Sequence, residues 1–163
     1  MANVVYASAG LIDSFYAALS EVASERVYIE MIEPPPLEKV RGFQTSLIEK
    51  NGPVFYAVET GDTVVGWADI FPSENPRLKH RGSLGMGLVK SHRGQGLGTK
   101  LLSSALAKAK EFGLEKVELT VYTTNTAAIA LYKKLGFEIE GHIKHYRKLD
   151  GVYFDCLAMG KFL

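Results

Sequence analysis

The segment LVKSHRGQGLGT, residues 88–99, carries the residue types best suited to chemistry in this sequence, because three glycines stand at alternate positions. An apolar run precedes the segment and a helical pattern follows it. Residues without side chains let several backbone N–H groups point at one locus, and the positive end of a helix dipole adds to them. The spacing therefore predicts an anion site suited to phosphate.

Two common phosphate motifs do not fit this loop. A Walker A loop requires G-x-x-x-x-G-K-[ST] and a dinucleotide fingerprint requires G-x-G-x-x-G. Counting either motif from Gly94 places a required glycine at Thr99. What remains is R-x-x-G-x-G, which Arg93, Gly96 and Gly98 satisfy. For the loop alone, a glycine-rich turn without a ligand is the alternative.

A second motif follows in the segment VELTVYTTNTAAIALYKKLGF, residues 117–137. It has the form N-x-x-A-x-x-x-Y-x-x-x-G-F, and its places are filled in order by Asn125, Ala128, Tyr132, Gly136 and Phe137. With R-x-x-G-x-G before it, the sequence resembles the GNAT superfamily of N-acetyltransferases, in which the first motif is the pyrophosphate loop. The resemblance covers the chain from about residue 54 to its end.

The resemblance implies acetyl-coenzyme A (acetyl-CoA) as the cosubstrate and assigns residues to it. The backbone of Met86, Gly87 and Leu88 would pair with the pantetheine arm like an extra strand, and Gly85 and Gly87 fit that close approach. Asn125 would cap its helix and also bond the pantetheine. The pyrophosphate would be wrapped by Arg93, Gly94, Gln95, Gly96, Leu97, Gly98 and Thr99.

The resemblance also implies a catalytic role for Tyr132. A phenol has a pKa near ~10 and keeps its proton at neutral pH, so it can protonate the departing thiolate as a general acid. Asn125 and Tyr132 are two helical turns apart and share a face. The alternative is an ordinary core tyrosine on an apolar stripe.

The general base and the acceptor contacts are open, since the run Ser83–Val89 contains no acid. The alternatives for the base are a water relay, Asp69 on the preceding strand, His80, and Glu30 or Glu33 in the loop before the prolines. Carboxylates within a few ångströms would attract a cationic amine. Glu30, Glu33 and Asp69 are therefore the candidate acceptor contacts, and solvated surface acids are the alternative for each.

The elements that must position these residues follow from the hydrophobic pattern. Strand–helix–strand units around Gly98 and Asn125 imply parallel pairing, and the Asp150-Gly151 turn implies an antiparallel hairpin. The expected fold class is α/β, a GNAT-like single layer of mixed sheet with helices on both faces, in the order β α α β β β α β α β β. The expected strands are 4–8, 54–60, 63–71, 83–89, 117–121, 137–149 and 152–162, and the expected helices are 11–23, 37–48, 97–112 and 125–135.

Composition and length indicate a single globular domain, residues 1–163. The chain has 19 Lys+Arg and 18 Asp+Glu, and this balance lacks the basic surface typical of nucleic-acid binding. No apolar run approaches a membrane span of roughly 18 residues. The single cysteine excludes an intrachain disulfide and favours a reducing, cytoplasmic location. We expect no nucleic acid, no membrane and no metal as partners.

We therefore expect an enzyme, an acyltransferase that moves an acetyl group from acetyl-CoA to a primary amine of a small molecule by direct attack in a ternary complex. Acetylation of a protein N-terminus or lysine is the alternative within the enzyme class. A non-catalytic acetyl-CoA-binding module is a third hypothesis, against which Tyr132 argues. The resemblance also allows a homodimer, because dimers are common in that family, and it does not name the acceptor.

Overall fold

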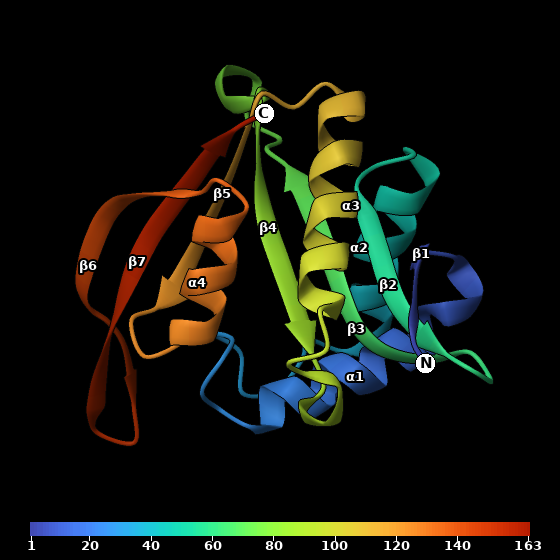
Figure 1. Ribbon diagram of the computed structural model, residues 1–163, viewed down its shortest axis with the longest axis horizontal. Coiled ribbons are helices and arrows are strands. Elements are labelled where there is room, and N and C mark those ends of the chain that lie inside the picture. The colour runs from blue at the N-terminus through green and yellow to red at the C-terminus, as the bar shows by residue number, and fades with distance from the viewer.

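The computed structural model describes all 163 residues, which form seven strands and four α-helices (Figure 1). The elements follow one another in the predicted order. Short 3-10 turns lie in three of the connections. The strands are β1 (Asn3–Tyr6), β2 (Val54–Glu59), β3 (Thr63–Pro72), β4 (Arg81–Leu88), β5 (Lys116–Tyr122), β6 (Glu138–Leu149) and β7 (Val152–Phe162), and the helices are α1 (Ile12–Ser24), α2 (Leu37–Glu49), α3 (Leu97–Phe112) and α4 (Thr126–Lys134).

The strands form one sheet in the order β1-β2-β3-β4-β5-β7-β6, which confirms the predicted mixed sheet. β4 and β5 run parallel, as expected for the unit around Gly98, and all other neighbours are antiparallel. The predicted parallel pairing of β5 with β6, from the unit around Asn125, is wrong, because β7 lies between these two strands. β7 buries Cys156 and Met159, whereas β6 is mostly exposed and suits the edge of the sheet.

Helices cover both faces of this sheet (Figure 1). α1 and α2 lie on one face, where Asp69 of β3 accepts a hydrogen bond from Gln44 of α2. α3 lies on the other face, and α4 packs near its first turn, since a Cβ at Gly98 would be 3.2 Å from Leu131 Cδ2. β3 is consequently buried on both sides along most of its length.

β4 and β5 pair at one end only, and this leaves a gap within the sheet. Their register joins Arg81–Ser83 to Lys116–Glu118 and extends no further. Beyond these residues the two strands diverge, and β4 runs on to the loop that precedes α3 (Figure 1). The gap therefore opens the facing edges of β4 and β5 to a ligand.

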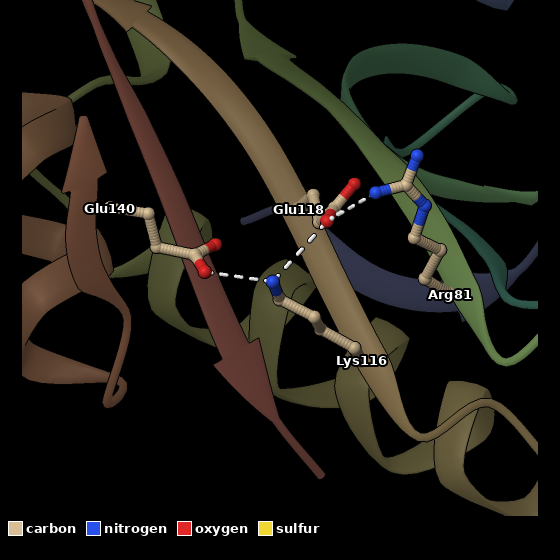
Figure 2. Close-up of polar contacts among 4 residues, drawn as sticks. All are labelled: Arg81, Lys116, Glu118 and Glu140. Atoms are coloured by element: carbon tan, nitrogen blue, oxygen red, sulfur yellow. Dashed lines mark hydrogen bonds and ion pairs between the residues drawn. The ribbon is translucent and has the colours of Figure 1, made fainter. Parts of the chain in front are cut away.

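An ion-pair network holds the closed end of the gap (Figure 2). Arg81 of β4 is 2.9 Å from Glu118 of β5, and Lys116 Nζ is 3.3 Å from the same carboxylate and 2.7 Å from Glu140 of β6. The contact between Lys116 and Glu140 crosses β7 at Gly160, where any side chain would collide with it. The network thus ties β4, β5 and β6 together where the two strands part.

The hairpin turns have the backbone that their sequences predict. Gly61 and Asp62 have φ values of 82° and 60°, and Asp150 and Gly151 have φ values of 50° and 81°. Two consecutive left-handed residues are typical of the tight turns that match the twist of a hairpin. None of the helices is both long enough and apolar enough to cross a membrane.

Candidate active site

The loop before α3 presents unpaired backbone N–H groups. Gly94 and Gly96 have φ values of 73° and 80°, which favour glycine, and Gly96 is the N-cap of α3. The first hydrogen bond of the helix runs from Lys100 N to Gly96 O at 3.2 Å, and the N–H groups of residues 94–99 donate to no protein acceptor. Such groups at the positive end of a helix dipole can hold phosphate oxygens.

The side chain of Arg93 is engaged by the protein itself. Its Nε donates to Leu88 O at 2.9 Å, and its terminal nitrogens donate to the carboxylate of Glu25 at 2.9 and 2.5 Å. The guanidinium also lies 4.4 Å from the ring centre of Tyr28. The hydrogen bond to Glu25 raises the pKa of Arg93. We expected Arg93 to wrap a pyrophosphate, but its side chain ties the loop to the end of α1 and leaves the N–H groups that follow to hold an anion.

Past its paired end, β4 has a free edge toward β5. Residues of an antiparallel strand direct their backbone groups to the two neighbours alternately. Val89 N donates to Val65 O on the β3 side at 3.0 Å. Leu84, Met86 and Leu88 therefore direct their backbone groups away from β3 and into the gap, where Leu88 O already accepts the bond from Arg93 Nε. An extended ligand can add to such an edge as a further strand, which is the role expected of Met86 and Leu88.

Two glycines of β4 leave room for side chains of β3. A Cβ at Gly85 would lie 2.7 Å from Asp69 Oδ1, and a Cβ at Gly87 would lie 2.8 Å from two ring carbons of Trp67. We expected these glycines to admit a ligand, and by the same alternation the backbone of Gly87 faces β3. The structure shows that they admit Asp69 and Trp67, which brings both side chains across β4 toward the gap.

Asp69 is a buried carboxylate in a polar network. It is 6% exposed, and its Oδ2 accepts a hydrogen bond from Gln44 Nε2 at 2.9 Å. The hydroxyl of Tyr56 donates to Gln44 Oε1 at 2.6 Å. Burial raises the pKa of Asp69 from 3.8 to about 7, and the bond from Gln44 opposes this rise. A carboxylate with a pKa near neutrality is suited to act as a general base.

Tyr132 lies on the buried face of α4. It is 8% exposed, burial raises its pKa to about 12, and its hydroxyl makes no hydrogen bond to the protein. The tyrosine therefore holds its proton at neutral pH, as a general acid must. Asn125 caps the same helix through a bond from Ala128 N to its Oδ1 at 3.2 Å. The predicted cap at Asn125 is confirmed, whereas its contact with pantetheine and the catalytic role of Tyr132 stay predictions.

One cavity of about 1290 Å³ joins the loop, the gap and these side chains. Four of the predicted residues do not line it. Gln95 donates from its side chain to Ser91 O at 3.1 Å and Leu97 is buried in the core, so only their backbone is available to a ligand. Predicted residues that do line it are Glu30, Asp69, Met86, Gly87, Leu88, Arg93, Gly94, Gly96, Gly98, Thr99, Asn125 and Tyr132, and those that do not are Glu33, His80, Gln95 and Leu97.

The loop between α1 and α2 is held over one end of the cavity. Glu30 lines the cavity and accepts a hydrogen bond from the hydroxyl of Tyr146 on β6. Arg26 is 2.8 Å from Asp150 in the turn between β6 and β7. With Glu25 bound to Arg93, this loop is tethered both to the anion loop and to the last hairpin. Glu30 and Glu33 were both predicted as acceptor contacts, but only Glu30 lines the cavity.

Sequence reasoning did not single out Gln44 or Tyr56. Gln44 was detectable, because it is a polar residue one turn from Val40 and Leu47 on the apolar stripe of α2. Tyr56 had no such signal, since an aromatic residue in a strand is ordinary. The clamp from Arg93 to Glu25 joins residues 68 positions apart and had no sequence signal either.

Comparison with known proteins adds the family. The model of the Acetyltransferase (GNAT) family matches residues 15–137. The chain is 30% identical over 150 residues, 90% of its length, to the L-amino acid N-acetyltransferase AaaT of Escherichia coli, of which 91% is covered. An acetyltransferase of the GNAT family from Streptococcus pneumoniae has the same fold, with a TM-score of 0.92, 27% identity and full coverage of both chains. The yncA protein of Salmonella typhimurium, solved with its cofactor acetyl-CoA, also has a TM-score of 0.92, at 19% identity over all of this chain and 94% of that one.

Proposed function

The chain belongs to the Acetyltransferase (GNAT) family, and from this premise we propose that it transfers the acetyl group of acetyl-CoA to the amino group of a small amino acid or a close analogue. One observation carries the proposal: a single cavity contains both a buried carboxylate with a near-neutral pKa, on β3, and a protonated phenol, on α4. The similarity to an L-amino acid N-acetyltransferase supports this acceptor class.

The residues around the gap fit acetyl-CoA. The N–H groups of residues 94–99 match a pyrophosphate, and the free edge of β4, at Met86 and at the N–H of Leu88, matches the amides of an extended arm. When bound there, acetyl-CoA supplies a thioester whose carbonyl carbon is open to attack by an amine. The cavity is also large enough for two ligands at once, which supports direct transfer in a ternary complex.

Asp69 and Tyr132 would handle the protons of the reaction. Asp69 Oδ1 accepts the proton that the amine nitrogen loses as the C–N bond forms. Tyr132 donates its hydroxyl proton to the sulfur as the C–S bond breaks, and water restores it afterwards. Burial raises the pKa of Asp69 to about 7, which suits a base at neutral pH, and it raises the pKa of Tyr132 to about 12, which keeps the hydroxyl protonated until the sulfur needs the proton. Glu30 offers the ammonium form of the acceptor a carboxylate, and that form loses one proton to water before the neutral amine attacks.

The tethered loop between α1 and α2 supports a small acceptor over a protein. Contacts from Glu25 to Arg93 and from Arg26 to Asp150 hold the start of the loop, and the hydroxyl of Tyr16 donates to Pro35 O at its end. A peptide would need an open groove at this place, and loosening the loop would break both ion pairs. Acetylation of a protein N-terminus or lysine is therefore the less supported alternative.

The proposal is tested by release of free thiol from acetyl-CoA with a panel of acceptors. The panel should contain L-amino acids, the amines that correspond to them without the carboxyl group, polyamines and short peptides with free N-termini. We expect the highest kcat/KM with L-amino acids. Release that depends on peptides alone would contradict the small-molecule proposal, and no acceptor-dependent release across the panel would contradict acetyl transfer to amines.

A further inference from the structure

Three buried polar side chains from separate elements meet beside the gap. Gln44 comes from α2, Tyr56 from β2 and Asp69 from β3, and they are 3%, 0% and 6% exposed. A hydroxyl–amide–carboxylate chain joins them, with distances of 2.6 Å from Tyr56 to Gln44 and 2.9 Å from Gln44 to Asp69. Unpaired polar groups are costly to bury, so each member depends on its neighbour.

The direction of these two hydrogen bonds fixes the orientation of the Gln44 amide. Burial and the nearby Asp69 raise the pKa of Tyr56, so its hydroxyl keeps its proton and acts as the donor. The oxygen of the amide therefore faces Tyr56 and its nitrogen faces Asp69. A donor in this place stabilises the ionised form of the carboxylate.

Only one oxygen of Asp69 is used by the network. Oδ2 accepts the bond from Gln44, whereas Oδ1 accepts no hydrogen bond from the protein. Oδ1 lies over the backbone of β4, since a Cβ at Gly85 would be 2.7 Å from it. Gly85 and Asp69 both line the cavity. The free oxygen is thus next to the edge at which β4 parts from β5.

We propose that Gln44 and Tyr56 are positioning residues for Asp69: they hold Oδ2 inside the protein so that Oδ1 faces the gap, where an amine loses its proton. This inference rests on the proposed function, in which Asp69 is the proton acceptor. The neighbouring elements present Gln44 from α2, Tyr56 from β2, Gly85 from β4 and Phe15 from α1, which stacks on Tyr56. Of these groups only Tyr56 titrates, and it stays neutral.

The substitution Gln44→Met tests the proposal, because it removes both hydrogen bonds at similar side-chain length. Ile48→Met is the matched control on the same helix, since Ile48 packs against the core and does not line the cavity. The readout is an NMR titration of the Asp69 carboxyl carbon in the protein alone, assigned by its disappearance in Asp69→Asn. We expect a pKa of about 7 in the wild type and in the control, and a value about one to two pH units higher in Gln44→Met.

Tyr56→Phe provides a second variant and keeps the test decisive if Gln44→Met does not fold. It removes the hydroxyl that orients the amide but leaves Gln44 able to donate, so the pKa of Asp69 should rise by a smaller amount. In the presence of acetyl-CoA and the best acceptor, the acidic limb of kcat/KM should move with the NMR titration. The acceptor amine titrates on the same limb, but it does so equally in every variant.

An unchanged Asp69 titration in both Gln44→Met and Tyr56→Phe overturns the positioning role. Reduced turnover of Gln44→Met with an unmoved acidic limb overturns it as well, because that is the result of a purely structural defect. The NMR titration needs no acceptor, so it can reject the positioning role while acetyl transfer stands. A protein that titrates as expected but acetylates no amine would instead contradict the proposed function alone.

Discussion

Replacing Asp69 with asparagine should stabilise the protein above pH 7 while it removes the proposed proton acceptor. In the folded protein, burial raises the pKa of this carboxyl group from 3.8 to about 7. In the unfolded chain the group ionises near its ordinary pKa of about 4. At pH 8 the wild-type protein therefore holds a buried charge that folding removed from water, whereas the amide of Asp69→Asn carries none.

The size of this effect follows from the two pKa values. One pKa unit corresponds to about 1.4 kcal/mol, so the rise to about 7 lowers the stability of the wild type at pH 8 by about 4 kcal/mol. Because the folded state binds the proton more tightly than the unfolded state, the loss begins near pH 4, grows to about pH 7 and is constant above. The amide places an N–H near Gly85 with no protein acceptor, which costs about 1–3 kcal/mol at every pH. The pH-dependent part of the difference is therefore the quantity to measure.

Urea unfolding of the wild type and of Asp69→Asn at pH 4.5 and pH 8 measures that part. Between these two pH values the difference in the free energy of unfolding should move in favour of Asp69→Asn by about 3 kcal/mol. Glu33→Gln is the control, since it removes an exposed carboxyl group outside the cavity and should show no comparable change. The same Asp69→Asn protein should lose most of its turnover.

A difference between wild type and Asp69→Asn that is equal at both pH values would refute the reasoning. It would mean that Asp69 is already ionised in the folded protein at pH 4.5, so that burial does not raise its pKa. A pH-dependent difference together with unchanged turnover would refute a different step. In that case Asp69 would be a buried carboxyl group that takes no part in proton transfer.

Three further predictions concern other parts of the cavity. Tyr132→Phe should lower kcat by about 10²–10⁴-fold and leave the KM for acetyl-CoA nearly unchanged, because it removes the acid but not the ring. The measurement is steady-state kinetics at saturating acceptor, and a wild-type kcat would contradict the role of Tyr132 as the acid. Gly96→Val should abolish the rise in melting temperature that acetyl-CoA gives the wild type, since a side chain at a φ of 80° distorts the anion loop; a retained shift would exclude that loop as the site. Glu30→Gln should raise the KM of the amine several-fold and leave that of acetyl-CoA alone, whereas Glu33→Gln should change neither, and equal effects of the two would remove Glu30 from the acceptor site.

The sequence by itself determined the parts of the molecule that depend on near neighbours. The bounds of α3, the cap at Asn125 and the turn at Asp150-Gly151 agree with the structure to within a few residues. Caps and tight turns are set by φ values and by side chains within three or four positions, so local spacing is enough to predict them. The two motifs likewise identified the family, because each lies within a short stretch of chain.

The tertiary structure decided how those parts meet. β7 rather than β6 lies beside β5, β4 and β5 part after a short paired end, and Arg93 clamps Glu25 of α1. None of these features follows from spacing, because each depends on which distant segment buries which surface. The same holds for Asp69, whose neighbours Gln44 and Tyr56 come from other elements. A carboxyl group takes its pKa from the burial and the hydrogen bonds that packing creates, so the sequence could name Asp69 as a candidate base, but only the fold gives it the environment of one.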